Sequence, residues 1–251
     1  MPLWEDEIMK KSVIVLLAVT MMICLSACGG ASSQKLVMAT NAAFPPYESV
    51  DGSEIIGIDP EIAKLIADDL GRELVIEDMA FDSIIAAVQS GKADIAMAGL
   101  TVTEDRKQNI NFSDPYTEAA QVIVVKKDST VTSPDDLEGK TIGVQIGTTG
   151  DIYAGDIADA VIERYSKYFE AINALNQDKI DAVIVDREPA KVFVNDSDEL
   201  KMIDEEFTLE EYAIGVAKEN TELLDQINAS LKKLQDSGKI DEIINKYIKA
   251  E

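Results

Sequence analysis

The sequence of 251 residues predicts an α/β protein with two lobes, and three observations support this prediction. Short apolar runs that suit strands alternate with segments that have the apolar spacing of amphipathic helices, an order typical of parallel βαβ units. A new unit of this kind begins after a polar stretch at residues 133–140. Glycine and threonine occur where strands end, and open α/β sheets bind ligands beyond the carboxyl ends of their strands.

The first lobe is expected to begin with the apolar strand KLVMAT at residues 35–40. Apolar residues at helical spacing predict a helix at residues 58–70, which a glycine ends. A strand at residues 73–77, a second amphipathic helix at 81–89 and a strand at 95–98 follow it along the chain. These elements form parallel βαβ units, which bury both faces of a sheet.

The second half predicts strands at 121–126, 141–145, 180–186 and 212–217, and helices from residue 151 and at 222–234 and 240–248. Pro189 suits the first turn of a helix after the third of these strands. We assign residues 35–123 and 218–251 to the first lobe and residues 124–217 to the second. Two strands are therefore expected to cross between the lobes.

Composition excludes several function classes. The chain is 46% hydrophobic and 28% charged, which is typical of a folded protein. Its formal charge of −24 argues against a nucleic acid partner and against charge-driven binding to an anionic membrane. The chain has no histidine, which removes the commonest general base and the commonest metal ligand. We expect neither a metal nor a cofactor.

The N-terminal residues predict an export signal. Lys10 and Lys11 precede an uncharged run at residues 12–27. Its apolar centre is too short for a comfortable transmembrane helix, which needs about 20 residues. A basic start, a short apolar run and small residues before a cleavage site describe a secretory signal.

The end of this run, LSACG at residues 25–29, resembles the lipobox of bacterial lipoproteins. The resemblance implies cleavage before Cys28, so that residues 1–27 are a signal peptide and Cys28 carries a diacylglycerol thioether. Residues 28–34 would then form a flexible polar tether, and the protein would be anchored by lipid to the outer face of the cytoplasmic membrane. An uncleaved anchor, or plain secretion with a free Cys28, is the alternative.

The stretch at residues 94–116 carries uncommon chemistry. A short apolar run ends at Gly99, and Thr103 with two acids behind it suits a helix N-terminus. Gly99 lets a ligand approach the backbone, the Thr101 hydroxyl can donate or accept, and Arg106 offers a planar fork of donors. Together they describe a seat for a small carboxylate. The alternative is an ordinary loop with Arg106 paired to a neighbouring acid on a solvated face.

Other candidate side chains also follow predicted strands, which favours a ligand between the lobes. They are Asn41, Phe44, Thr101, Thr148, Thr149 and Asp186. Taken alone, the aromatic rings of Phe44 and Phe81 are more often core residues, and Asp186 could equally be a helix cap.

Four motifs in this order resemble the extracellular solute-binding proteins of polar amino acid ABC transporters, family 3. They are ATNAAFPPYE, GKADIAMAGLTVTEDRKQNINFSDPY, GVQIGTTG and DAVIVDREPA. The resemblance covers essentially all of residues 35–248. It implies the two-lobe type II fold of periplasmic binding proteins, with two crossing hinge strands that close on one amino acid. The implied partners are a free amino acid and the membrane permease of an ABC importer, and the implied state is a monomer.

The resemblance also implies how the ligand is held. Arg106 would clamp the α-carboxylate with help from Thr101 and from the amide or hydroxyl of Thr149, and Asp186 would accept from the α-ammonium group. A zwitterion buried between lobes needs an opposite charge at each end, because an unpaired buried charge is costly. The other implied contacts are Thr148, backbone groups of Ala98 and Gly99, and the rings of Phe44 and Phe81 on either side of the ligand side chain.

Specificity is expected to depend on Asn41 and Gln145. Related proteins that hold cationic or amide side chains often have aspartate at position 41, so Asn41 weakens an assignment to lysine or arginine. Gln145 offers an amide, and Glu48 is expected at the rim. We therefore expect polar uncharged or cationic ligands such as glutamine, cystine or arginine. Glutamate and aspartate should bind at least about tenfold more weakly.

Two other function classes compete with this interpretation. Some proteins of this fold are enzymes, such as cyclohexadienyl dehydratases, and they need an additional acid or base in the cleft that no residue here marks. A surface lipoprotein that only contacts other proteins would not explain Arg106 and Asp186. We expect a binding protein and not an enzyme.

Overall fold

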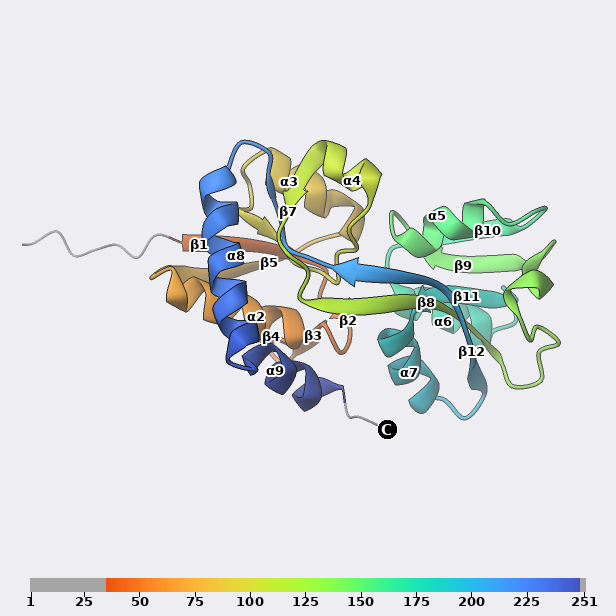
Figure 1. The fold of residues 1–251 in the computed structure, drawn as a ribbon. Coiled ribbons are helices and arrows are strands. Elements are labelled where there is room, and N and C mark those ends of the chain that lie inside the picture. Colours follow the sequence, from red (N-terminus) through yellow and green to blue (C-terminus); the bar gives the residue numbers. More distant parts are fainter. Residues whose placement is uncertain (1–34, 249–251) are drawn as a thin grey trace, which may run out of the picture. The chain divides into compact units, whose positions relative to one another are not determined.

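A computed structural model of the protein describes residues 35–248, whose strands form two five-stranded sheets and one of three strands (Figure 1). The expected signal peptide, Cys28 and the tether lie outside these residues. None of the helices within residues 35–248 is long and apolar enough to cross a membrane.

The first sheet has the strand order β5-β1-β6-β13-β7. Its strands are β1 (Lys35–Thr40), β5 (Glu73–Asp78), β6 (Ile95–Ala96), β7 (Ile110–Phe112) and β13 (Gly215–Ala217). β1 is parallel to β5 and β6, whereas β13 is antiparallel to β6 and β7. The first three strands therefore end at one edge of the sheet.

Within residues 35–248, the first lobe has five helices, namely α2 (Ile58–Asp69), α3 (Ile84–Gln89), α4 (Glu104–Asn109), α8 (Thr221–Asp236) and α9 (Lys239–Tyr247). The predicted spacing of α2 is confirmed, because Ile58, Ile62 and Ile66 are fully buried in the core. The helix expected at residues 81–89 begins instead with a 3-10 turn, η1 (Phe81–Ser83), before α3.

The second sheet has the strand order β10-β9-β11-β8-β12. Its strands are β8 (Thr117–Lys126), β9 (Thr141–Gln145), β10 (Val161–Tyr165), β11 (Ala182–Asp186) and β12 (Leu200–Tyr212). β9 is parallel to β10 and β11, and β8 is antiparallel to β11 and β12. The helices of this lobe are α5 (Thr149–Gly155), α6 (Tyr168–Asn176) and α7 (Arg187–Asn195), with a 3-10 turn, η2 (Pro134–Leu137), before β9.

The chain passes between the two sheets twice. It leaves the first sheet after β7 and enters β8, and it returns from β12 to β13 (Figure 1). The boundary expected between residues 123 and 124 falls inside β8, because this strand pairs with the second sheet from Thr117 onward. The boundary expected after residue 217 lies at the end of β13, which pairs with the first sheet. The single strand expected at 212–217 is two strands that belong to different sheets.

A small antiparallel sheet completes the first lobe. It contains β2 (Ala43–Phe44), β3 (Glu48–Asp51) and β4 (Glu54–Ile56). This sheet, which was not predicted, begins two residues after Asn41 and carries Phe44 and Glu48. Both side chains are buried, with Glu48 0% exposed.

Candidate functional site

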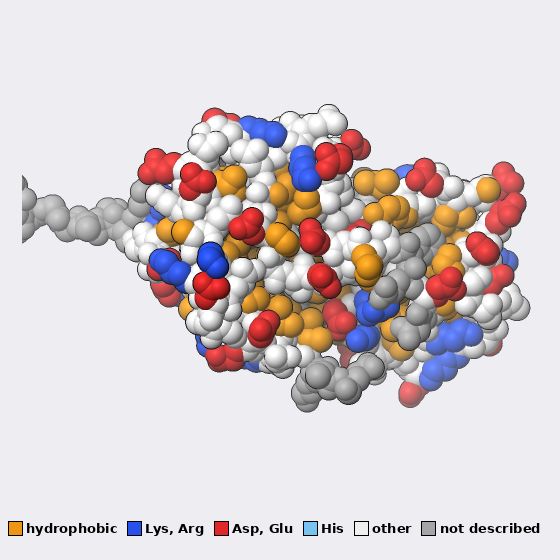
Figure 2. Space-filling model, viewed as in Figure 1, with side chains coloured by type: hydrophobic (Ala, Val, Ile, Leu, Met, Phe, Trp, Pro, Cys, Tyr) orange, Lys and Arg blue, Asp and Glu red, His pale blue; other side chains and the backbone are white. Residues whose placement is uncertain are grey.

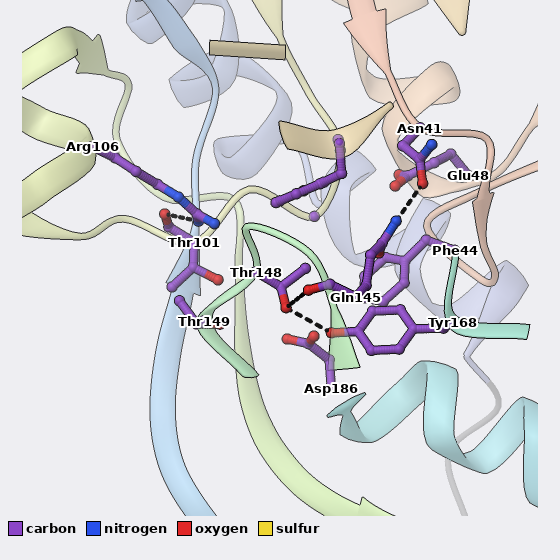
Figure 3. A pocket seen from close by; sticks show the side chains of 13 residues that line it. Asn41, Phe44, Glu48, Thr101, Arg106, Gln145, Thr148, Thr149, Tyr168 and Asp186 are labelled. Carbon is purple, nitrogen blue, oxygen red and sulfur yellow. Dashed lines mark hydrogen bonds between the residues drawn. The ribbon is translucent and has the colours of Figure 1, made fainter. Parts of the chain in front are cut away.

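One pocket is lined by every residue that the sequence singled out for ligand binding, and its volume is about 290 Å³ when the space open to solvent is included. Its lining consists of Asn41, Phe44, Glu48, Phe81, Ala98, Gly99, Thr101, Arg106, Gln145, Thr148, Thr149, Tyr168 and Asp186. In Figure 3, Arg106 lies with Thr101 and Thr149 at one end, and Gln145 lies with Asn41 and Glu48 at the other. Each end combines residues of the first lobe with a residue of the second, Thr149 at one end and Gln145 at the other.

Arg106 is buried at the junction of the two lobes. It lies in the first turn of α4, and the Oγ1 of the predicted N-cap Thr103 accepts from the Arg106 backbone amide at 3.2 Å. Its side chain donates from Nη1 to the carbonyl of Thr101 at 2.7 Å and from Nη2 to the carbonyl of Gly147 at 3.1 Å. Burial lowers the pKa of the guanidinium, an effect that nearby carboxylates oppose. Backbone oxygens from both lobes thus fix the direction of the guanidinium fork.

The two threonine hydroxyls beside Arg106 are already engaged. Thr101 Oγ1 donates to Glu210 Oε2 at 2.7 Å, and Thr149 Oγ1 donates to the same oxygen at 3.1 Å. Thr149 is also the first residue of α5, where backbone amides have no partner within the helix. A carboxylate on Arg106 would therefore meet backbone amides in preference to the hydroxyl protons of Thr101 and Thr149.

Thr148 has a mainly structural position in the lining. It is the N-cap of α5, and its Oγ1 accepts from the amide of Asp151 at 3.3 Å. The same hydroxyl donates to the carbonyl of Gln145 at 2.8 Å and accepts from the hydroxyl of Tyr168 at 3.2 Å. Thr148 thus links the lining residues Gln145 and Tyr168 of the second lobe (Figure 3).

Asp186 stands at the N-cap of α7, yet its side chain makes no capping hydrogen bond. Its Oδ1 instead accepts from the Tyr212 hydroxyl at 2.5 Å. Burial, followed by the charge of Glu210, raises the pKa of Asp186 to about 7, although hydrogen bonds from Tyr212 and Gln121 act in the opposite direction. A buried carboxylate at this point favours a cation beside it, because a positive charge would relieve both effects.

At the far end of the pocket, Asn41 and Gln145 bind each other across the two lobes. Gln145 Nε2 donates to Asn41 Oδ1 at 2.9 Å and to the carbonyl of Ser166 at 2.9 Å. Asn41 Nδ2 donates to the carbonyl of Met79 at 2.7 Å. Both protons of the Gln145 amide are therefore engaged, and its oxygen remains to accept from a ligand.

Glu48 was expected at the rim of the pocket, and that expectation is wrong. The residue is 0% exposed, and no amide, guanidinium or hydroxyl group among residues 35–248 donates to either carboxylate oxygen. Burial, followed by the neighbouring charge of Asp59, raises the pKa of Glu48 well above its usual range. The small sheet that was not foreseen explains the difference, because β3 turns Glu48 inward onto the lining.

Behind the lining, Asp59 holds the loop that carries Gly99. Its Oδ2 accepts from the Gly99 amide at 2.9 Å and its Oδ1 from the Tyr116 hydroxyl at 2.8 Å. Burial raises the pKa of Asp59 to about 6. Gly99 has a φ of +54°, and a Cβ there would lie 2.8 Å from the Phe44 ring. A glycine at position 99 therefore lets the loop pack closely against the Phe44 ring in the lining of the pocket.

The aromatic side chains of the lining are the two expected rings, Phe44 and Phe81, and Tyr168, which was not predicted. Phe44 stacks on Tyr168, with ring centroids 5.6 Å apart and an interplanar angle of 27°. Phe81 lines the pocket on the Arg106 side, where the guanidinium carbon is 5.4 Å from the ring centroid. The sandwich of a ligand between Phe44 and Phe81 remains a prediction.

Sequence reasoning missed three residues that shape the site. Tyr168 begins α6 and reaches Phe44 of the other lobe, while Asp59 and Glu210 are buried acids behind the lining. The chain contains 47 aspartates and glutamates, so an acidic residue by itself gave no signal of burial. Figure 2 shows how widely acidic side chains are spread over one face of the surface.

The fold and the pocket define a two-lobe binding protein. The chain belongs to the bacterial extracellular solute-binding proteins, family 3, whose model matches residues 36–250.

Relatives of known description agree with this membership. The chain is 32% identical over 254 residues to the arginine-binding extracellular protein ArtP of Bacillus subtilis, covering 97% of this chain and 100% of that protein. The structure of holo ArgBP from T. maritima has 42% identity and a TM-score of 0.79, covering 85% of this chain and 95% of that one. ArtJ from Geobacillus stearothermophilus, described as an arginine-, lysine-, histidine-binding protein, has 35% identity and a TM-score of 0.82, covering 87% and 96%.

Asp186 should make the stability of the unliganded protein depend on pH. The pKa of Asp186 is about 7 in the folded protein, above the value of about 3.9 in an unfolded chain. Its contribution to stability is therefore fully present below pH ~4 and is lost as the pH rises through about 7, at no more than about 1.4 kcal/mol per pH unit. Urea unfolding between pH 5 and 8 should show a steeper decline for the parent than for Asp186→Asn.

The exposed Asp198→Asn is the matched control and should follow the parent curve. Parallel curves for the parent and Asp186→Asn would contradict the raised pKa of Asp186.

Proposed function

We propose that this protein is the substrate-binding component of an ABC importer and captures one L-amino acid with a cationic side chain between its two lobes. The observation that carries the proposal is the placement of charges along the pocket. A buried guanidinium stands at one end, a buried carboxylate at the other, and a second carboxylate lies between them.

The first end suits the backbone groups of an amino acid. Arg106 can bind a carboxylate through two parallel hydrogen bonds, which are among the strongest in proteins. Asp186 lines the same pocket and accepts hydrogen bonds, so it suits the α-ammonium group. Each charge of the zwitterion then has an opposite charge beside it, which offsets the cost of burying it.

The other end favours a side chain that only donates hydrogen bonds. The ionised form of Glu48, which a neighbouring cation would favour, presents only acceptors there, and Gln145 has both amide protons engaged and offers its oxygen. A guanidinium or ammonium group carries donors and no acceptor. The side chain of glutamine would bring its own carbonyl oxygen to this group of acceptors, and that of glutamate would bring a negative charge.

The balance of charge points the same way. The charged residues of the lining are Glu48, Arg106 and Asp186, a net charge of −1 when both acids are ionised. An amino acid with a cationic side chain has a net charge of +1, which makes the filled pocket neutral. Stacking of Phe44 on Tyr168 adds flat aromatic surface, and planar guanidinium groups pack well on such faces.

The relatives support a narrower set of candidate ligands than the sequence alone does. ArtP and ArgBP carry names that specify arginine, and ArtJ carries one that adds lysine and histidine. Asn41 weakened a cationic assignment because it replaces an acid, but Glu48 offers a carboxylate at the same end of the pocket. We therefore place L-arginine first among the polar and cationic candidates.

Binding without turnover is the second part of this proposal. The acids of the pocket can each be assigned to holding a charged group of the ligand or to supporting the loop of Gly99. The dehydratase alternative needs one more acid or base at the reacting atoms of a cyclic carboxylate. The relatives described above are named as binding proteins, which supports the choice of capture over catalysis.

We further propose that the protein is a monomer held on the outer face of the cytoplasmic membrane by a lipid on Cys28, and that it delivers its ligand to a permease. The support for the anchor is the LSACG sequence at residues 25–29, which lies outside the described residues. The polar residues that follow would let the folded part stand away from the membrane.

Glu48→Gln should change which amino acid the protein prefers. The substitution keeps an oxygen acceptor but removes the charge that would pair with a cationic side chain. Loss of one partner from a buried charge pair costs about 2 to 5 kcal/mol, so we expect L-arginine to bind at least ~30-fold more weakly. Calorimetric titration with L-arginine and L-glutamine should show that the preference for arginine shrinks by a similar factor.

Glu54→Gln, on the neighbouring strand and exposed, is the control and should behave as the parent does. An unchanged preference in a Glu48→Gln variant with a native circular dichroism spectrum would refute the cationic assignment. A parent protein that binds glutamate or leucine best would refute it as well.

The anchor can be tested in cells through Cys28→Ser. If a lipid on this sulfur holds the protein, the variant should appear in the medium and lose labelling by a clickable palmitate. Labelling that persists in the variant would show that the attachment is elsewhere.

A further inference from the structure

Glu210 is a buried acid in the strand through which the chain returns to the first lobe. It lies near the C-terminal end of β12, is 6% exposed and does not line the ligand pocket. Its two neighbours in the strand, Leu209 and Glu211, are exposed. Burial of an acid is costly unless hydrogen-bond donors surround it, so the groups that donate to Glu210 indicate its role.

Three side chains donate to one oxygen of Glu210. Thr101 of the first lobe donates to Oε2 at 2.7 Å, Thr149 of the second lobe at 3.1 Å and Gln121 Nε2 at 3.3 Å. Gln121 Nε2 also donates to Thr149 Oγ1 at 3.2 Å. Glu210 therefore joins groups from both lobes directly behind the end of the pocket that holds Arg106.

The direction of these hydrogen bonds has a chemical consequence. A threonine hydroxyl has a single proton and two lone pairs, and a carboxylate can only accept. Since the proton of Thr101 is committed to Glu210, the side of its oxygen that faces the pocket carries lone pairs. Thr101 then presents an acceptor to a ligand, as Asp186 does on the opposite lobe.

We propose that Glu210 is a positioning residue that fixes the Thr101 hydroxyl as an acceptor for the ligand α-ammonium group, and so makes the pocket select amino acids over their α-hydroxy analogues. This inference rests on the proposed function and assigns a residue that does not touch the ligand. An ammonium group donates to both Thr101 and Asp186. A hydroxyl in its place has one proton and leaves one of these acceptors unpaired, which is costly in a buried site.

The same arrangement explains why an acid occupies position 210 and not an amide. A glutamine there could donate through its amide group, and the Thr101 hydroxyl could then turn its proton toward the pocket. The hydroxyl would become a donor, which suits the oxygen of a hydroxy acid better than an ammonium group. The charge of Glu210 thus decides the hydrogen-bonding character of a side chain in the other lobe.

The test compares L-arginine with argininic acid, its α-hydroxy analogue, by calorimetric titration. The parent should prefer L-arginine, and Glu210→Gln should reduce the ratio of the two affinities about tenfold or more, since hydrogen bonds to charged groups have this magnitude. The exposed neighbour Glu211→Gln should keep the ratio of the parent. A substitution that only loosens the fold would weaken both ligands equally and leave the ratio unchanged, and that result would overturn the inference.

Thr101 supplies a second and independent comparison. Thr101→Val removes the hydroxyl and should lower the ratio of the two affinities as Glu210→Gln does. Thr101→Ser keeps a hydroxyl and should therefore keep the ratio of the parent. The combined Glu210→Gln and Thr101→Val variant should lower the ratio no further than either change alone. If Glu210→Gln does not fold, these Thr101 variants decide, and a Thr101→Val variant with the parent ratio would overturn the inference.

If the proposed function is wrong, the titration of the parent gives a different result. A parent that does not bind L-arginine would refute the cationic assignment. The ratio for L-glutamine and its α-hydroxy analogue, in the same variants, would then test the role of Glu210.

Discussion

The structure depends on one buried guanidinium. Arg106 donates to the Thr101 carbonyl in its own lobe and to the Gly147 carbonyl in the other, so its position is defined only when the two lobes meet. A buried cation needs partners on every side, and backbone oxygens cannot neutralise its charge. The carboxylates Asp186 and Glu210 supply the negative charge around it. The buried positive charge of Arg106 therefore accounts both for the acidic side chains around the cleft and for a binding site that suits a carboxylate.

These acids are arranged in two layers. Glu48 and Asp186 line the pocket, while Asp59 and Glu210 lie behind it and accept from a backbone amide or from hydroxyl groups. The inner layer would meet the ligand, and the outer layer holds the inner surface in place. Support of this kind holds the binding side chains in the geometry that the ligand needs. A mobile side chain would have to be ordered on binding, and the entropy lost would weaken the affinity for the ligand. Contacts across the cleft, such as Gln145 to Asn41, show that the same side chains also join the lobes.

The sequence predicted what local patterns determine. β1 and β9 match the predicted bounds because their apolar runs are short and clearly bounded, and the Thr103 cap is confirmed by its bond to the Arg106 amide. β10 was missed because Val161–Tyr165 is an edge strand with charged residues and no clear alternation. Burial of Glu48, Asp59 and Glu210 could not be read from the sequence, since it depends on elements that are distant along the chain. For the same reason the ring that stacks on Phe44 is Tyr168, a residue of the other lobe.

Calorimetric titration of L-arginine into the parent and into Arg106→Ala tests the central claim most directly. The account predicts binding by the parent and a loss of ~30-fold to several thousandfold in the variant, because one partner of a buried charge pair is removed. Arg106→Lys should fall between them, since it keeps the charge but not the planar fork. Lys107→Ala, an exposed change in the same helix, should bind as the parent does. Unchanged affinity in an Arg106→Ala variant with a native circular dichroism spectrum would contradict the account.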